Sequence, residues 1–268
     1  MNTPNSNPES NLDLSSDIIV IGGGPAGSAA ATMLARKGWQ VTLLEREQFP
    51  RDHVGESLLP ASIPVLEELG ALSAIENAGF LKKYGATMVW GSEPDPWSWS
   101  FREASPRYPH AFQVVRSQFD EILLRNAADH GVDVRERHRV LTADAGPSGA
   151  NLRVEGDEIR EHTIHARFVI DASGQSGLVA HARSLREPDP FFRNLAIYGY
   201  YSGGARLPQP DANNILIESI KDGWLWVIPL HTGLASVGVG VDSSVGREQI
   251  AKLGAQSFFR EQIATGPH

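Results

Sequence analysis

A glycine-rich turn between an apolar strand and a helix constrains the fold of this 268-residue chain more than any other feature. The stretch from Asp17 to Glu47 reads DIIVIGGGPAGSAAATMLARKGWQVTLLERE. Its pattern predicts a buried strand at 18–21, a helix from about 25 to 36 and a second strand at 41–44. This order indicates the first strand, turn and helix of a parallel α/β sheet.

The residues of the turn fit the G-x-G-x-x-G pattern of a dinucleotide-binding site. Gly22 allows the tight turn, Gly24 lets a pyrophosphate approach the backbone, and Gly27 lets helix and strand pack closely. The positive end of the helix faces the phosphates. Glu45 ends the second strand, about 20 residues after the glycines, and is placed to accept both hydroxyls of an adenosine ribose. The sequence therefore predicts a Rossmann-type dinucleotide site.

Composition removes several classes of function. The formal net charge of −8 argues against nucleic acid, and the absence of cysteine excludes disulfides, thiolate metal sites and cysteine nucleophiles. The first sixteen residues lack the pattern of a signal peptide and predict a disordered tail, and the apolar runs are too short to span a bilayer. A cytoplasmic location without stable membrane insertion is expected.

Two other kinds of catalytic site are disfavoured by spacing. Gly55-Glu56-Ser57 is followed by Leu59 where a nucleophile elbow needs glycine, so a serine hydrolase is not expected. His162 and His165 lack zinc-binding spacing and are interpreted as solvated side chains of a strand, so no metal site is predicted.

Two later segments favour FAD over a nicotinamide cofactor. VVRSQFDEILLRNAADHG predicts Arg116 at a strand end before a helix capped by Ser117, and ARFVIDASGQSG predicts a strand ending at Asp171 before a turn at Gly174. The residues between, about 132–166, predict a small antiparallel excursion. From the residues alone, Arg116 could equally be a surface salt-bridge partner, and Asp171 a helix or turn cap.

This arrangement resembles the FAD-binding half of flavoprotein monooxygenases of the glutathione-reductase-like type. The resemblance implies that Arg116 contacts the cofactor and that the segment 171–174 packs near its adenosine-phosphate part. The cofactor-binding residues implied together by turn and resemblance are Gly22, Gly24, Ala26, Gly27, Glu45, Arg46, Arg51, Ser57, Arg116, Asp171 and Gly174.

Three further motifs narrow the resemblance. They are FPR…GESLLP at 49–60, a K-x-G-x-x-x-x-W-G stretch from Lys83 to Gly91, and G-W-x-W-x-I-P at 223–229. Together they resemble the flavin-dependent halogenases that act on phenols and pyrroles, within a superfamily that includes the geranylgeranyl reductases. The fold expected is an α/β Rossmann-type FAD-binding domain joined to the beginning of a mostly antiparallel β substrate domain.

The resemblance implies FADH2-dependent chlorination or bromination of an electron-rich aromatic such as a phenol or pyrrole, as in antibiotic biosynthesis. The same resemblance implies that a separate flavin reductase supplies FADH2 and that O2 and a halide are co-substrates. A flavin hydroperoxide yields hypohalous acid, which passes to Lys83 as a haloamine or a hydrogen-bonded acid, two roles that the sequence leaves open. Trp224 and Trp226, on one face of a strand, are implied to separate flavin from substrate; core packing also explains their spacing.

The predicted domains are a tail at 1–16, an FAD-binding domain at 17–78 and 107–185, and a partial substrate domain at 79–106 and 186–268. The halogenase pattern matches only the first half of a usual member, so we expect a truncated chain that binds FAD weakly, self-associates and does not halogenate on its own. The alternatives are an FAD-dependent monooxygenase or reductase of the same superfamily, or an inactive FAD-binding fragment. The aromatic substrate is either free or tethered to a carrier protein.

Overall fold

The structure is a computed structural model that describes residues 16–91, 95–156 and 161–266. The chain divides into two compact units. The first comprises the residues up to Phe49 together with Leu123–Leu185, and the second comprises Pro50–Ile122 together with the residues from Arg186 onward. Residues 50–78 and 107–122 therefore cluster with the second unit, whereas the predicted domain bounds, which stay a prediction, assigned them to the first. The predicted tail lies outside the described residues except for Ser16, which begins the first strand.

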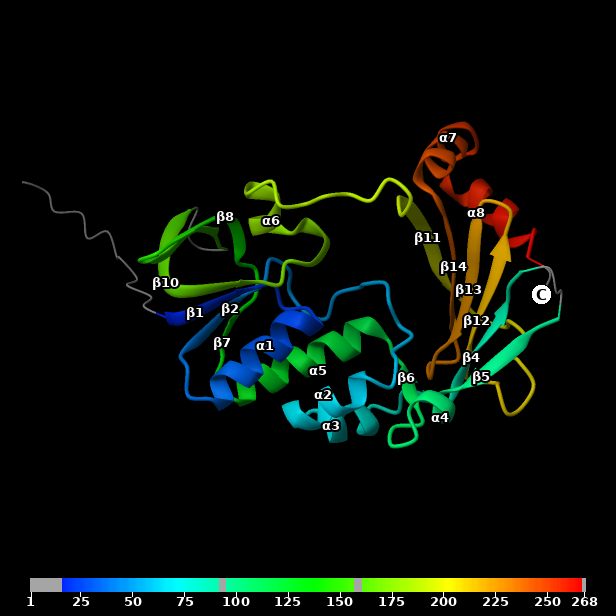
Figure 1. Ribbon diagram of the computed structural model, residues 1–268, viewed down its shortest axis with the longest axis horizontal. Coiled ribbons are helices and arrows are strands. Elements are labelled where there is room, and N and C mark those ends of the chain that lie inside the picture. Colours follow the sequence, from blue (N-terminus) through cyan, green and yellow to red (C-terminus); the bar gives the residue numbers. More distant parts are fainter. Residues whose placement is uncertain (1–15, 92–94, 157–160, 267–268) are drawn as a thin grey trace, which may run out of the picture. The chain divides into compact units, whose positions relative to one another are not determined.

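The first unit is built on a six-stranded sheet (Figure 1). Its strand order is β7 (Asp133–Arg135), β2 (Val41–Leu44), β1 (Ser16–Ile21), β10 (His162–Asp171), β9 (Gly149–Glu155) and β8 (Arg139–Gly146). The pairs β7–β2, β2–β1 and β1–β10 are parallel, and the pairs β10–β9 and β9–β8 are antiparallel. The expected antiparallel excursion is confirmed for β8 to β10 but was wrong for β7, because a strand that follows a crossover helix returns in parallel.

Both faces of this sheet are covered. Alternate residues of β1 enter two separate cores: Ile18 and Val20 pack with residues of α1 (Pro25–Arg36) and of α5 (Arg116–Asp129) that lie in the first unit. Ile19 and Ile21 pack with β8, β9 and β10 on the opposite face, beside α6 (Leu178–Ala182). Burial on both sides explains why the strand is a continuous apolar run.

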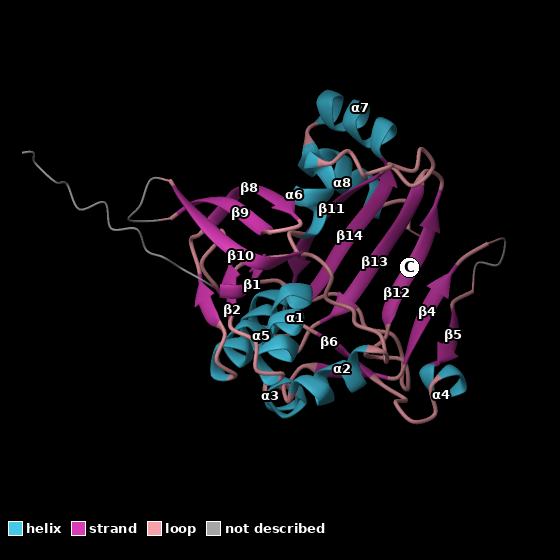
Figure 2. Ribbon diagram, turned by 60° about the vertical axis from the view of Figure 1, so that its left-hand side comes forward, coloured by secondary structure: helices cyan, strands magenta, loops and turns pink. Residues whose placement is uncertain are grey.

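The second unit contains a second six-stranded sheet (Figure 2). Its order is β11 (Asn194–Tyr201), β14 (Ala235–Asp242), β13 (Gly223–Pro229), β12 (Ile215–Ile220), β4 (Gly85–Val89) and β5 (Trp97–Ser100). Only the β12–β4 pair is parallel, so the expected mostly antiparallel character is confirmed. One face packs against α8 (Ala255–Ile263), whose Phe258 and Phe259 meet β13 and β14.

A two-stranded sheet completes the second unit. It pairs β3 (Leu81–Lys83) with β6 (Ala111–Gln113) in antiparallel fashion. The remaining helices of this unit are α2 (Ser62–Leu69), α3 (Leu72–Asn77), α4 (Phe101–Ala104) and α7 (Ser243–Leu253). Within the described part of the chain, no helix combines the length and the apolar character needed to cross a bilayer.

Candidate functional site

The glycine turn of the first unit has a backbone that only glycine allows. Gly22 has φ +102°, and a β-carbon there would lie 2.5 Å from the carbonyl oxygen of Ala172. A β-carbon on Gly27 would lie 1.9 Å from the carbonyl oxygen of Gly22. Gly24 precedes α1 in extended conformation without a side-chain cap, and Ala26 is exposed in the first helical turn. The N-terminus of a twelve-residue helix is thereby left open to an anion, which fits a cofactor pyrophosphate.

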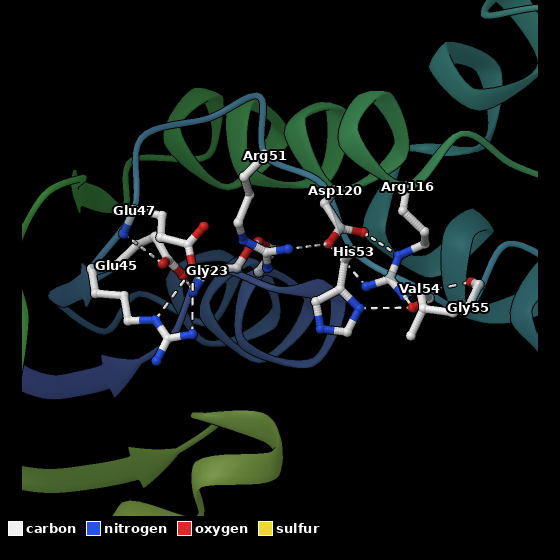
Figure 3. A network of polar contacts seen from close by, with 11 residues as sticks. Gly23, Glu45, Glu47, Arg51, His53, Val54, Gly55, Arg116 and Asp120 are labelled. Carbon is white, nitrogen blue, oxygen red and sulfur yellow. Dashed lines mark hydrogen bonds and ion pairs between the residues drawn. The ribbon is translucent and has the colours of Figure 1, made fainter. Parts of the chain in front are cut away.

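Glu45 lies against this turn (Figure 3). Its side chain is buried, and its Oε2 accepts a hydrogen bond of 2.6 Å from the backbone nitrogen of Gly23 while Oε1 accepts one of 2.8 Å from that of Glu47. A carboxylate has about four acceptor positions, so capacity for ribose hydroxyls remains. Arg46, next in sequence, is exposed and pairs with Glu47 at 3.3 Å. The first unit therefore fits the adenosine ribose and pyrophosphate of FAD.

The side chain of Asp171 organises the turn after β10. It accepts hydrogen bonds from the backbone of Ser173 at 3.1 Å and of Val179 at 2.7 Å, so it caps the start of α6. Burial by itself would raise the pKa of Asp171, but these hydrogen bonds hold it below its ordinary value. Gly174 follows with φ +63°. The capping role is what the structure displays, and a contact of either residue with the cofactor stays a prediction.

A buried carboxylate lies between two arginines in the second unit (Figure 3). Asp120 is fully buried; it receives hydrogen bonds of 2.8 and 2.9 Å from Arg116 and an ion pair of 3.3 Å from Arg51. Arg116 also donates to the carbonyl oxygen of Val54 at 2.5 Å. The alternative of Arg116 as a surface salt-bridge partner was right about the salt bridge but wrong about the surface, since the Arg116 side chain is only 11% exposed.

The expected cap of α5 was also wrong. The helix begins at Arg116, so Ser117 lies inside its first turn. The Asp120 carboxylate instead binds the guanidinium of Arg116 four residues earlier. Sequence reasoning missed Asp120 as a member of this group, although an arginine and an aspartate at i and i+4 in a helix are a signal for such a pair.

Lys83 is the most unusual side chain of the second unit. It is 1% exposed, and its Nζ donates a hydrogen bond of 2.5 Å to Oγ of Ser57 and lies 5.2 Å from the centre of the Phe101 ring. Burial lowers the pKa of Lys83 to about 8, because the apolar surroundings disfavour the charged form. The neighbouring Lys82 is partly exposed and pairs with Glu76 at 2.8 Å, as expected of an ordinary lysine.

Glu56, the residue before Ser57, lies in the same region, and the sequence did not predict it as a site residue. Glu56 is fully buried, and it accepts hydrogen bonds of 2.9 Å from the hydroxyl of Tyr200 and from the backbone nitrogen of Gly55. Burial, together with the negative charge of Glu56, raises the pKa of Tyr200. Because Tyr200 is 144 residues away in sequence, no local pattern indicated the pair.

Trp224 and Trp226 share one face of β13, as predicted. Trp226 packs with Ile228 and Leu230 while Trp224 contacts this cluster, and Leu225 lies on the opposite face in the core beneath α8. The two indoles lie opposite glycines of the neighbouring strand β14, Gly240 and Gly238 respectively. Whether this pair separates flavin from substrate stays a prediction.

The structure thus brings the predicted residues together in three groups. Glu45 joins the glycine turn, Arg51 and Arg116 join at Asp120, and Ser57 joins Lys83.

The two histidines of β10 differ from each other: His165 is exposed, as expected. His162 is partly buried, and burial lowers its pKa, so its expected solvation was wrong.

Comparison with known proteins agrees with these geometries. The family model described as FAD binding domain matches residues 15–231. The chain is 40% identical over 261 residues to "Tryptophan 2-halogenase" of Chondromyces crocatus, covering 96% of this chain and 49% of that protein. It is 34% identical over 284 residues to the "1H-pyrrole-2-carbonyl-[peptidyl-carrier protein] chlorinase" of Pseudomonas fluorescens, covering 93% of this chain and 60% of that protein.

Solved structures give the same result. The myxobacterial chondrochloren halogenase CndH, described as a variant of FAD-dependent halogenases, superposes with a TM-score of 0.86 at 42% identity, over 94% of this chain and 58% of that one. The flavin-dependent halogenase CmlS gives a TM-score of 0.88 at 36% identity, over 94% and 46%. The chain spans about half the length of the curated relatives it matches. The resemblance to flavin-dependent halogenases is confirmed, and the chain belongs to the FAD binding domain family.

Proposed function

We propose that the protein catalyses FADH2-dependent chlorination or bromination of an electron-rich aromatic such as a phenol or pyrrole. The observation that carries the proposal is Lys83, a buried lysine with a pKa lowered to about 8, held by Ser57 and Phe101. Burying a lysine without an opposite charge costs stability, and strongly perturbed groups cluster at functional sites. The relatives, which include halogenases for tryptophan and for a carrier-bound pyrrole, support this chemistry.

The first unit would hold the cofactor through the glycine turn and Glu45. The N-terminus of α1 faces the pyrophosphate, and the free acceptor positions of Glu45 take the ribose hydroxyls. When bound and reduced, FAD together with O2 and a halide supplies hypohalous acid. The contacts of Ala26, Arg46, Arg51, Ser57, Arg116, Asp171 and Gly174 with the cofactor are part of the same proposal.

Lys83 has two chemically distinct ways to use hypohalous acid. At a pKa of about 8, roughly one lysine in ten is neutral at pH 7. The neutral amine attacks the halogen through its lone pair, so that an N–halogen bond forms while the halogen–oxygen bond breaks, and the departing hydroxide takes a proton from the nitrogen and leaves as water. The ammonium form instead donates a hydrogen bond to the oxygen of the acid and makes the halogen more electrophilic. The first role binds the reactive halogen to Nζ and the second holds it one bond away on the oxygen, and in both an aromatic carbon can take it up.

The two tryptophans would exclude direct contact between cofactor and substrate. Their indoles lie on one face of β13, and large flat rings make an efficient barrier there. We propose a separate flavin reductase as the supplier of FADH2. For the substrate, both a free aromatic and one tethered to a carrier protein fit the proposal, and the similarity to a carrier-protein chlorinase favours testing both.

The test uses the chain reconstituted with the C-terminal half that the matched relatives carry, together with FAD, a flavin reductase, NADH, bromide or chloride, and a phenol or pyrrole supplied free and on a carrier. Mass spectrometry detects the halogen isotope pattern. We expect product from the reconstituted protein with the unaltered sequence and with Lys82→Ala, and none with Lys83→Ala, with flavin oxidation continuing in all three. An oxygenated product that forms without halide would contradict the proposal and favour a monooxygenase. If Lys82→Ala loses product while Lys83→Ala keeps it, the role belongs to Lys82, and the proposal names the wrong lysine.

A further inference from the structure

The side chain of Gln113 carries a buried acceptor that the fold does not use. Gln113 is fully buried on β6, and its Nε2 donates a hydrogen bond of 3.1 Å to the carbonyl oxygen of Asn213. Its Oε1 is also buried and accepts no hydrogen bond from the described residues. An unsatisfied buried acceptor destabilises a fold, so its presence in a well-packed region needs an explanation.

Strand pairing places Gln113 on the same face as Lys83. Gln113 lies opposite Leu81 on β3 and forms a bridge with Ser57 on its other side. Residues directly opposite each other, and residues two apart on one strand, point to the same face of a sheet. Lys83, two residues after Leu81, therefore shares a face with Gln113 and Ser57. The hydrogen bond between Lys83 and Ser57 agrees with this arrangement.

The three polar groups are complementary to one small molecule. Lys83 has two N–H donors when neutral and three when charged, and Ser57 accepts one of them. We propose that Lys83 Nζ, Ser57 Oγ and Gln113 Oε1 surround a binding site for a small uncharged molecule that carries an O–H group. Its oxygen accepts a hydrogen bond from Lys83 and its proton is donated to Gln113.

In the proposed reaction, on which this step rests, that molecule is hypohalous acid. A halide ion or a hypohalite has no proton to donate, and its negative charge would face the carbonyl oxygen of Gln113. The carbonyl oxygen of Gln113 therefore favours the neutral acid, because only the acid can donate a hydrogen bond to it. Because the oxygen and the proton of the acid are engaged by Lys83 and Gln113, the halogen is the part left free to react.

The first experiment measures the effect of Gln113 on Lys83 without cofactor. The chain has five lysines, so incorporation of lysine labelled with carbon-13 at Cε gives a simple spectrum whose signals are followed against pH. Lys83→Ala identifies the Lys83 signal. Gln113→Glu places a negative charge on the same face and should raise the midpoint of Lys83 by about one pH unit or more. Gln113→Leu removes a carbonyl dipole and should lower it.

The matched control is Asn213→Ala. The Asn213 side chain donates to the carbonyl oxygen of Lys82 at 3.0 Å, so its loss loosens β3 while the carbonyl that Gln113 binds is kept. The Lys83 midpoint should stay in place in this variant. If neither substitution of Gln113 moves the midpoint, or if Asn213→Ala moves it equally, Gln113 does not act on Lys83 and the inference is overturned.

The second experiment follows the acid. In the halogenation assay Gln113→Leu should retain flavin oxidation, lose about tenfold or more of the halogenated product, and release more hypohalous acid to a soluble diketone scavenger. Unchanged product and scavenging would overturn the binding position. If the unaltered chain gives no halogenated product while the Lys83 midpoint responds to Gln113, the pairing of the two side chains is supported and the proposed function alone fails.

Discussion

Trp226 on β13 and Gly238 on β14 lie directly opposite each other, and the indole covers the glycine. A β-carbon on Gly238 would come within 2.1 Å of Cζ2 of Trp226, far inside contact distance. Trp224 has the same relationship with Gly240, where a β-carbon would lie 2.4 Å from the ring. The two glycines thus let the rings lie close to the backbone of the neighbouring strand.

The first prediction concerns this packing. Gly238→Ala should lower the free energy of unfolding by about 1–3 kcal/mol, because the added methyl group overpacks a buried cluster. Gly204→Ala is the control, since a β-carbon there meets nothing within 4 Å, and it should be neutral or slightly stabilising. Urea unfolding followed by tryptophan fluorescence measures both. Equal stability of the Gly238→Ala protein would show that the indole can move away without cost.

The second prediction concerns the stability cost of Lys83. Its pKa is about 8 in the folded chain against 10.5 for a free lysine, so between these values the unfolded chain binds more protons. The free energy of unfolding therefore rises with pH across this window, and the full penalty applies below about pH 8. Lys83→Met should stabilise the protein at pH 7 by up to about 3 kcal/mol, and the gain should shrink as pH rises toward 10.

Lys82→Met is the matched control for this series. Lys82 is partly exposed and its ion pair with Glu76 contributes little, so its removal should change stability by less than about 1 kcal/mol at any pH. Chemical unfolding at pH 7, 8, 9 and 10 gives the comparison. A gain from Lys83→Met that does not vary with pH would show that the pKa of Lys83 is the same in the folded and the unfolded chain, so that burial does not lower it.

The third prediction concerns the cofactor. Glu45→Gln should weaken FAD binding, because the amide keeps one acceptor and loses the charge that strengthens the ribose hydrogen bonds; Glu45→Ala should cost about 1–3 kcal/mol of binding free energy. Quenching of flavin fluorescence in a titration measures the affinity. Glu47→Gln changes an exposed carboxylate two residues away and should leave it unaltered. If all three variants bind FAD with the same affinity, Glu45 does not contact the cofactor.

The fourth prediction concerns the buried carboxylate of α5. Asp120→Asn should destabilise the chain by about 3–5 kcal/mol, because two guanidinium groups lose the charge that compensates them. Asp129→Asn, at the exposed end of the same helix, is the control and should have little effect. Thermal unfolding monitored by circular dichroism distinguishes them. A similar melting temperature for both variants would mean that Arg51 and Arg116 find other partners.

The sequence predicted those parts of the fold that local chemistry determines. The strand before Gly22 is recognisable because both of its faces are buried, and the turn is recognisable because Gly22 and Gly27 tolerate no side chain. Likewise the alternation of β13 is a local property, so the shared face of Trp224 and Trp226 followed from their spacing. Each of these features depends on residues within one segment.

The rest depends on contacts between distant segments. Ser57 and Lys83 are 26 residues apart, so their hydrogen bond was not indicated, and Ser57 was assigned to the cofactor instead. The partnership of Glu56 with Tyr200, and the position of Gln113 between Ser57 and Leu81, depend on strand pairing in the same way. The start of α5 was misplaced by two residues because Ser117 is a good cap by type, while Arg116 is held in the helix by Asp120.

The glycines opposite the two indoles also constrain how this sequence can evolve. A larger residue at position 238 or 240 is tolerated only where the facing ring has already become smaller, and a tryptophan can arise at 226 or 224 only opposite a bare backbone. The two strands must therefore change in pairs, ring and glycine together, through an intermediate with a gap rather than a clash. Among descendants of this chain, position 238 should covary with position 226, and position 240 with position 224.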